Sequence, residues 1–251
     1  MSGSTPRLRM FAGPNGSGKS TIKSPIRPEI LGVYVNPDEI EKEIGQRDSL
    51  DLRPYAIQTN TLEVQAFCRT STLAAKAGLL DGVLEWKVAD AKLDGFAVPI
   101  DSYIASVIAD FLRQKLFQAR IAFTFETVMS SPDKVELLRR SQAAGYRTYL
   151  YYVATDDPSI NISRVRNRVR TGGHGVPEDK IVSRYHRSLD LLPEAIRHSN
   201  RAFLFDNSGL QHVWVAEITD GKDLEMKTVR MPDWFKKAVW DKMPDADLGV
   251  K

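Results

Sequence analysis

The chain has 251 residues, of which 42% are apolar and 27% charged, the composition of a globular protein with one large domain. The net charge of +3 is too small to argue for binding to nucleic acid or a membrane, and no apolar stretch is long enough to span a bilayer. A single cysteine, Cys68, excludes an intrachain disulfide and a cysteine-based metal site, and the N-terminus lacks the apolar core of a signal peptide, so we expect a cytoplasmic protein.

The first predicted element is a strand that leads into a phosphate-binding loop. The apolar run Leu8–Ala12 precedes residues 13–20, Gly-Pro-Asn-Gly-Ser-Gly-Lys-Ser, which match the P-loop pattern G-x-x-x-x-G-K-[ST] without a mismatch. Its glycines let the backbone aim successive N–H groups at phosphate oxygens. Lys19 would reach the β- and γ-phosphates, and Ser20 would ligate Mg²⁺. The residues expected to bind the nucleoside triphosphate are Gly13, Pro14, Asn15, Gly16, Ser17, Gly18, Lys19, Ser20 and Thr21.

A second strand, Val33–Val35, places a carboxylate near the expected ligand edge of the sheet. Asp38 follows this strand and could take a proton from an acceptor hydroxyl as a general base. The alternative is that Asp38 caps a helix beginning at Glu39, and the two roles are compatible.

Residues 60–118 are the least regular part of the pattern. Glycines at 78, 82 and 95 interrupt helical periodicity there. We expect a helical insertion that covers or shapes a pocket, and an ordinary helical hairpin packed on the sheet is the alternative.

A third strand, Ile121–Phe125, ends in Glu126. A carboxylate at the end of a buried strand could hold an acceptor hydroxyl or a water bound to Mg²⁺. It could instead pair with a nearby cation.

The next strand, Thr148–Val153, precedes two helices rich in arginine, which begin at Asp157-Pro158 and near residues 176–179. Arg164 and Arg168 share one helix face, and Arg166 and Arg170 share another. With Gly172-Gly173 as a flexible joint, residues 157–190 fit a lid whose guanidinium groups, joined by Arg184, neutralise phosphate charge. The alternative is a solvated basic face, which we expect to account for Arg166 or Arg170. His174 beside the glycines would be a hinge or capping residue rather than an acid.

The chain then gives a fifth strand, Ala202–Phe205, and two further runs joined by an Asp220-Gly221 turn. Strands that alternate with helices predict an α/β P-loop kinase fold, a parallel sheet flanked by helices, with a C-terminal β-hairpin and a single domain over 1–251. The aromatic cluster Trp234, Phe235 and Trp240 would supply a contact surface.

Four segments together resemble the zeta-toxin family of P-loop kinases. They are Gly-Pro-Asn-Gly-Ser-Gly-Lys-Ser-Thr, Val-Asn-Pro-Asp-Glu-Ile, Phe-Glu-Thr, and Arg-x-x-x-Arg-Val-Arg-x-Gly-Gly-His-x-Val-Pro-Glu-Asp-Lys-Ile-x-x-Arg-Tyr, spread over residues 7–45 and 120–208. The arginine spacing and the Gly-Gly-His segment are more similar to the broad chromosomal branch than to the plasmid-borne toxins. The P-loop alone is shared by many ATPases, so the ordered combination carries the resemblance.

The resemblance implies an ATP-dependent kinase that phosphorylates a hydroxyl of a small molecule, with ATP and Mg²⁺ as cofactors. Better-understood relatives phosphorylate UDP-N-acetylglucosamine, which makes a UDP-sugar one candidate acceptor. A toxin-antitoxin relationship would place any inhibitor on a separate antitoxin chain. The implied site residues are Lys19 and Ser20 for phosphate and Mg²⁺, Asp38 as base, Glu126 for the acceptor, Arg164, Arg168 and Arg184 on the phosphates, and Asn207 near the adenine.

Two other functions remain open from the residues alone. A nucleic-acid end kinase, or a nucleoside kinase, would suit the arginine content, but we find no basic groove interleaved with aromatic residues. A P-loop ATPase switch would need a strand that ends in adjacent acids, whereas the strand before Glu126 ends in one.

Overall fold

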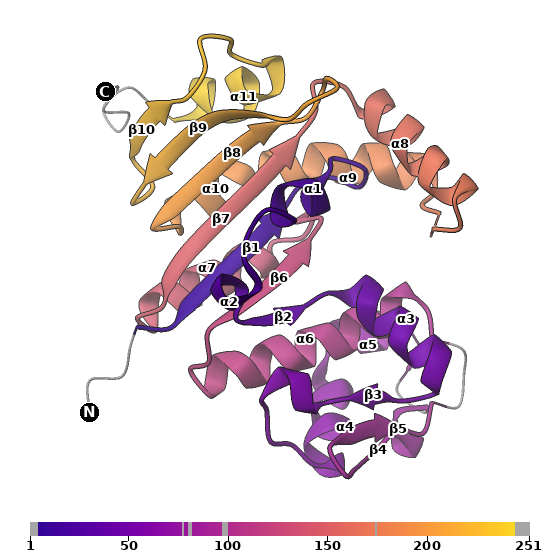
Figure 1. The fold of residues 1–251 in the computed structure, drawn as a ribbon. Helices are drawn as coiled ribbons and strands as arrows, with labels where there is room; N and C mark the ends of the chain where they lie inside the picture. Colours follow the sequence, from indigo (N-terminus) through magenta and orange to yellow (C-terminus); the bar gives the residue numbers. More distant parts are fainter. Residues whose placement is uncertain (1–4, 77, 80–81, 97–99, 174, 244–251) are drawn as a thin grey trace. The chain divides into compact units, whose positions relative to one another are not determined.

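The computed structural model describes residues 5–76, 78–79, 82–96, 100–173 and 175–243, and the chain divides into two compact units. The first unit contains residues 1–31 and 126–251, and the second contains residues 32–125. Figure 1 shows the elements of both. A single kinase domain over 1–251, with residues 60–118 as an insertion, stays a prediction.

The first unit is built on a sheet whose strands lie in the order β10-β9-β8-β7-β1. Strands β1, β7 and β8 run parallel, whereas β8–β9 and β9–β10 are antiparallel pairs. This arrangement confirms the predicted parallel sheet with antiparallel strands at its C-terminal end. Asp220 and Gly221, with φ of 49° and 73°, form the predicted turn between the last two strands. The strands span β1 Arg7–Ala12, β7 Arg147–Ala154, β8 Arg201–Asp206, β9 Val213–Thr219 and β10 Asp223–Met226.

One face of this sheet is the core of the first unit. Leu150, Tyr152 and Leu204 are fully buried on it, and the Tyr152 hydroxyl is 3.0 Å from the Ser188 hydroxyl of α9. Figure 1 shows helices behind the sheet in this view. The helices of the unit are α1 Lys19–Lys23, α2 Pro28–Leu31, α7 Asp133–Ala143, α8 Pro158–Arg170, α9 Glu178–Asp190, α10 Leu192–Arg197 and α11 Asp233–Ala238, followed by the 3₁₀ turn η3 Trp240–Lys242.

The aromatic cluster near the C-terminus belongs to this core. Trp234 and Phe235, on α11, are 2% and 0% exposed, and the Trp234 ring lies 6.0 Å from that of Tyr152. The prediction that this cluster forms a contact surface is therefore wrong for these two residues. The reason is that a short helix after the last strand returns to the sheet and buries its aromatic face there.

The second unit joins a short parallel strand pair to a small helical and antiparallel region. Strand β2 pairs with the first part of β6, with Val33 opposite Phe123. A separate three-stranded sheet has the order β3-β5-β4. The elements are β2 Val33–Val35, α3 Pro37–Arg47, β3 Leu50–Asp51, η1 Arg53–Tyr55, α4 Thr61–Thr70, α5 Thr72–Lys76, η2 Gly82–Glu85, β4 Lys87–Ala89, β5 Lys92–Asp94, α6 Ser102–Gln118 and β6 Phe123–Thr127, and β6 leads back into the first unit.

Cys68 lies in the core of the second unit. It is fully buried on α4, and burial raises the pKa of its thiol to about 12. A thiol in such surroundings is a small buried hydrophobic group, not a nucleophile. Across the described ranges, no helix is long and apolar enough to cross a membrane.

Candidate nucleotide-binding site

The P-loop backbone adopts a conformation that requires glycine. Gly13, Gly16 and Gly18 have φ of 143°, 75° and 96°, in the region that L side chains rarely adopt. A Cβ at Gly13 would lie 2.1 Å from the carbonyl oxygen of Val153, and one at Gly18 would lie 2.2 Å from Nδ2 of Asn207. The loop is therefore pressed against the end of β7 and the segment after β8. This close approach leaves its N–H groups to face a ligand, as a phosphate cradle requires.

Two asparagines tie the loop to distant parts of the first unit. Asn161, fully buried on α8, donates from Nδ2 to the carbonyl oxygen of Asn15 at 2.6 Å. Asn207, after β8, donates from Nδ2 to the carbonyl oxygen of Ser17 at 2.8 Å. Asn161 also accepts a hydrogen bond from the Thr155 hydroxyl. The sequence analysis missed Asn161, because an asparagine within a helical pattern gives no signal of a long-range partner.

Lys19 folds back over the loop that precedes it. Its Nζ donates to the carbonyl oxygens of Gly13 and Pro14 at 2.8 and 3.2 Å. A bound phosphate could replace these carbonyl oxygens as the acceptor, because an ammonium group carries three donors that can rotate toward a new partner. The half-buried side chain thus lies within the loop where the motif predicts it.

Several polar atoms of this region are buried without a hydrogen-bond partner among the described residues. They include Ser17 Oγ in the loop and Arg164 Nη1 on α8. An unsatisfied buried donor costs about 1–3 kcal/mol, so such atoms point to a polar ligand or ordered water. Both are able to donate to phosphate oxygens, so these residues fit an anionic nucleotide.

Two observations concern the predicted binding of Mg²⁺ by Ser20. Ser20 lies exposed in the first turn of α1, where a hydroxyl oxygen could join a hard cation held by phosphates. Among the described residues, no three or more His, Cys, Asp or Glu side chains gather into a group that could hold a metal ion. That Ser20 shares Mg²⁺ with the nucleotide stays a prediction.

Glu126 lies next to the helix that follows the P-loop. Its Oε1 is 3.4 Å from Nζ of Lys23, the last residue of α1, and the two side chains are 14% and 20% exposed. The alternative that Glu126 pairs with a nearby cation therefore holds. Because Lys23 is one helical turn beyond Lys19, the same pair places the carboxylate beside the phosphate-binding helix. Its role toward an acceptor stays a prediction.

The arginines of α8 separate into different environments. Arg164 donates from Nη2 to the carbonyl oxygen of Gly209 at 3.2 Å, so it leans toward the segment after β8. Arg166 is exposed and pairs with Glu178 of α9 at 2.6 Å, so its surroundings are those of the alternative, a solvated basic face. Arg168 is exposed near the end of the helix, and Arg184 is half-buried on α9. His174 lies outside the described residues.

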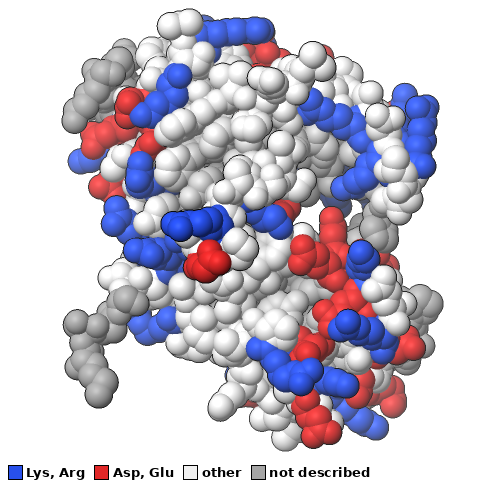
Figure 2. All heavy atoms as spheres, viewed as in Figure 1, with Lys and Arg blue, Asp and Glu red and all other residues white. Residues whose placement is uncertain are grey.

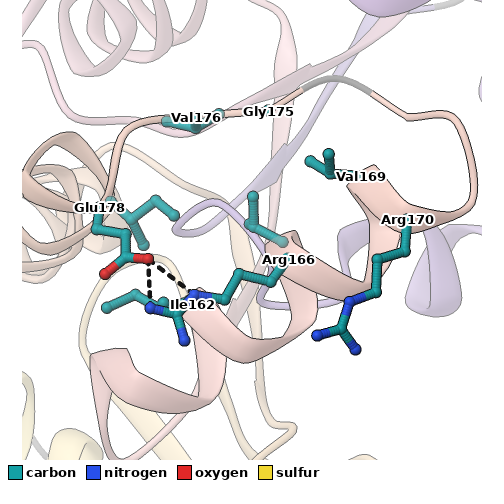
Figure 3. Close-up of a pocket in the computed structure, with 9 residues that line it drawn as sticks. Ile162, Arg166, Val169, Arg170, Gly175, Val176 and Glu178 are labelled. Atoms are coloured by element: carbon teal, nitrogen blue, oxygen red, sulfur yellow. Dashed lines mark hydrogen bonds and ion pairs between the residues drawn. The ribbon is translucent and has the colours of Figure 1, made fainter.

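A shallow cavity of about 280 Å³ lies between α8 and α9 (Figure 3). Its wall is mainly apolar, and the Arg166–Glu178 pair and Arg170 lie at its rim. Val165 and Val169 lie one turn apart on an apolar stripe of α8, and Val169 is 45% exposed and lines this cavity. The stripe is buried at Val165 but opens toward the end of the helix.

Asp38 belongs to the second unit, where it lies in the first turn of α3. The helix cap is Asn36, whose side chain accepts from the backbone N–H of Asp38 at 2.9 Å. The alternative that Asp38 is the cap is therefore wrong, because the helix starts at Pro37, two positions earlier than expected. The carboxylate of Asp38 is exposed and is not used for capping.

A comparison with protein families decides how this site is classified. Residues 103–214 match the zeta toxin family. The matched stretch contains Glu126, the arginine helices and Asn207, and the resemblance stated from the motifs is confirmed there. The P-loop and Asp38 precede it in the chain. This part of the chain is thus similar to zeta toxins.

Solved structures show the same fold over almost the whole chain. A chain of the AvrRxo1-ORF1:AvrRxo1-ORF2 complex with sulphate ions has a TM-score of 0.59 and 13% identity, covering 97% of this chain and 66% of its own. A chain of the complex with ATP has a TM-score of 0.58 and 12% identity, with the same coverage. At this identity the likeness shows the fold alone.

Two weaker similarities complete the comparison. A structure from the PezAT chromosomal toxin-antitoxin system of Streptococcus pneumoniae has a TM-score of 0.48, 15% identity, and covers 98% of this chain and 83% of its own. An uncharacterized protein of Haemophilus influenzae is 29% identical over 65 residues, 26% of this chain and 46% of that protein. The chain therefore matches under half of this curated relative and about two thirds of the AvrRxo1 chains.

Proposed function

We propose that this protein is an ATP-dependent kinase that transfers the γ-phosphoryl group to a hydroxyl of a small molecule. The observation that carries the proposal is the P-loop itself. Its glycine positions leave no room for a Cβ, its lysine lies within the loop, and Glu126 is held beside the helix that follows. A kinase needs this combination of phosphate binding and a carboxylate on the acceptor side.

The proposed reaction assigns a separate task to each group. Lys19 and the loop N–H groups hold the β- and γ-phosphates, while Glu126 orients the acceptor hydroxyl. Asp38 takes the proton as the hydroxyl oxygen bonds to the γ-phosphorus and the bond to the bridging oxygen of ADP breaks. The groups proposed to neutralise charge on the phosphates are Arg164, Arg168 and Arg184. Mg²⁺, held by Ser20 and the phosphates, would supply further charge neutralisation.

The resemblance to zeta toxins makes a UDP-sugar, such as UDP-N-acetylglucosamine, the first acceptor to test. Two further features of similar proteins support the wider proposal. An AvrRxo1 complex with the same fold was crystallised with ATP, and it contains a second protein, AvrRxo1-ORF2. We propose that this chain likewise binds ATP and has a separate protein partner of the antitoxin kind.

The test is transfer of label from γ-labelled ATP with Mg²⁺, offering UDP-sugars, nucleosides, oligonucleotides and water in parallel. We expect label on one small-molecule hydroxyl, and none with Lys19→Ala, which removes the phosphate-binding ammonium group. Lys222→Ala, at an exposed hairpin position, is the matched control and should keep full activity. Label on an oligonucleotide end, or full transfer by Lys19→Ala, would contradict the proposal.

A further inference from the structure

The two faces of the sheet in the first unit are not equally covered. On one face, Leu8, Met10 and Leu150 are fully buried under the helices. On the other face, Phe11 and Val153 are covered near the P-loop by residues of α1 and the segment after it, such as Ile22 and Ile26. Beyond that point most side chains of β7, β8 and β9 on this face are half-buried or exposed, with Glu217 at 6% as an exception. Because parallel strands are nearly always covered on both faces, the open face over the parallel strands β7 and β8 calls for a partner.

Aromatic rings form a continuous row across the open face. Phe11 and Tyr151 stack at 4.6 Å between ring centroids, Tyr151 and Phe203 at 4.9 Å, and Phe203 lies 6.1 Å from Trp214. Trp214 ends the row and is 39% exposed. In Figure 2 the area over β8 and β9 is largely uncharged. Because the rings stack on one another, their edges form an apolar platform that faces outward.

Arginines gather at one end of this platform. Arg7 of β1 lies directly opposite Arg147 of β7, and Arg9 follows on the same face. The guanidinium groups of Arg9 and Arg147 lie 5.2 and 5.9 Å from the centre of the Tyr149 ring. Among the described residues, none of these three arginines has a carboxylate within ion-pair distance. Arg9 is only 5% exposed, whereas Arg7 and Arg147 are exposed, and neighbouring exposed positive charges without a counter-ion favour an anionic partner.

At the opposite edge of the face, on β9 and β10, most carboxylates are already paired. Glu217 is already paired with Arg201, and Glu225 with Lys227 at 2.5 Å. A second copy of the chain would therefore bring Asp223 as the main exposed acid on this face. Single-stranded nucleic acid fits less well, because the ring faces that bases would stack on are occupied by other rings or by arginines.

We propose that this open face, the platform of Tyr151, Phe203 and Trp214 with Arg7 and Arg147 at its end, docks a separate acidic protein chain. Apolar side chains of that partner would cover the ring edges, and its carboxylates would pair with the two exposed arginines. The proposal does not depend on the kinase reaction, because none of these residues belongs to the nucleotide-binding site.

The experiment measures binding of a labelled copolymer of glutamate and tyrosine in a 4:1 ratio to the full chain, by fluorescence anisotropy at low salt. Poly-glutamate of similar length is the probe without rings. We expect the copolymer to bind more tightly than poly-glutamate, and Arg7→Ala with Arg147→Ala to weaken its binding about tenfold, as expected for two lost charge pairs. Trp214→Ser should reduce the advantage of the copolymer over poly-glutamate.

The controls distinguish an acidic protein partner from non-specific attraction, from single-stranded nucleic acid and from a second copy of the chain. Arg69→Ala with Arg230→Ala removes the same charge from exposed positions elsewhere and should leave binding unchanged. Equal weakening by both double variants would mean non-specific attraction and overturn the proposal. So would tighter binding of a thymidine oligonucleotide, or a dimer seen by light scattering that Trp214→Ser abolishes. A thermal unfolding scan of each variant confirms that it is folded.

Discussion

At the scale of single residues, the proposed chemistry depends on two carboxylates, those of Glu126 and Asp38. Their surroundings differ. Glu126 is half-buried and paired with Lys23, so its position is set by the fold of the first unit. Asp38 is exposed, in the first turn of a helix that Asn36 caps. A half-buried, paired carboxylate suits the orientation of a substrate, whereas an exposed one is accessible to accept a proton.

The first prediction follows from the position of Asp38. Asp38→Asn should lower kcat by about 10²-fold or more, the usual scale of a lost general base, while the dissociation constant for ATP stays the same. The fold should be unaffected, because the helix cap is Asn36. Steady-state kinetics with the acceptor and ATP titration measure the two effects. Glu39→Gln is the neighbouring control, and an unchanged rate in Asp38→Asn would exclude the role of base.

At the scale of elements, helix α8 has two tasks that lie at opposite ends. Its first turn ties the P-loop through Asn161, and its last turns line the cavity of Figure 3 and carry the arginines. The capping Asp157, which accepts from the backbone N–H of Ser159 at 2.7 Å, starts the helix where Asp-Pro predicted it. A substitution in the first turn should therefore affect stability and ATP binding, whereas one in the last turns should affect the rate of phosphoryl transfer.

The tether at the start of α8 gives a stability prediction. Asn161→Ala should lower the free energy of unfolding by about 1–3 kcal/mol, because the carbonyl oxygen of Asn15 loses a buried donor. The affinity for ATP should fall as well, since the loop loses its support. Denaturant unfolding and ATP titration check both effects. Asn167→Ala, at an exposed position of the same helix, should change neither.

The arginines at the end of α8 give a kinetic prediction. Arg168→Ala should slow phosphoryl transfer more than it weakens ATP binding, if Arg168 acts on charge that develops in the transition state. Arg166→Ala is the matched control, since exposed ion pairs like the one with Glu178 contribute about 0–1 kcal/mol. Single-turnover rates and ATP titration distinguish the two effects. Weaker ATP binding with an unchanged rate in Arg168→Ala would assign it to ground-state binding.

At the scale of the whole molecule, nucleotide binding should appear as a gain in stability. A ligand at 100 times its dissociation constant stabilises the native state by about 2.7 kcal/mol. We expect ATP with Mg²⁺ to raise the Tm, ATP with a chelator to raise it less, and Lys19→Ala to lose the shift. Differential scanning fluorimetry measures it. A shift of equal size in Lys19→Ala would show that the nucleotide binds away from the P-loop.

Sequence patterns predicted the parts of the molecule whose conformation depends on neighbours in the chain. The glycine spacing of the P-loop, the start of α8 at Asp157 and the turn at Asp220-Gly221 all follow from local backbone preferences. The strands of the first unit were recognised as short apolar runs that alternate with longer helical patterns. The family resemblance added the order of these segments.

What the sequence determined by itself is therefore the P-loop, the alternation of strands and helices, and the residue types able to bind phosphate. The tertiary structure decided which distant groups meet: the tether between Asn161 and the P-loop joins residues 146 apart, and that of Asn207 joins residues 190 apart. It also buried Trp234, paired Glu126 with Lys23, and left one face of the sheet open with its arginines and rings. The physical reason is that such contacts depend on how helices and strands pack in space, which local preferences and side-chain periodicity do not specify.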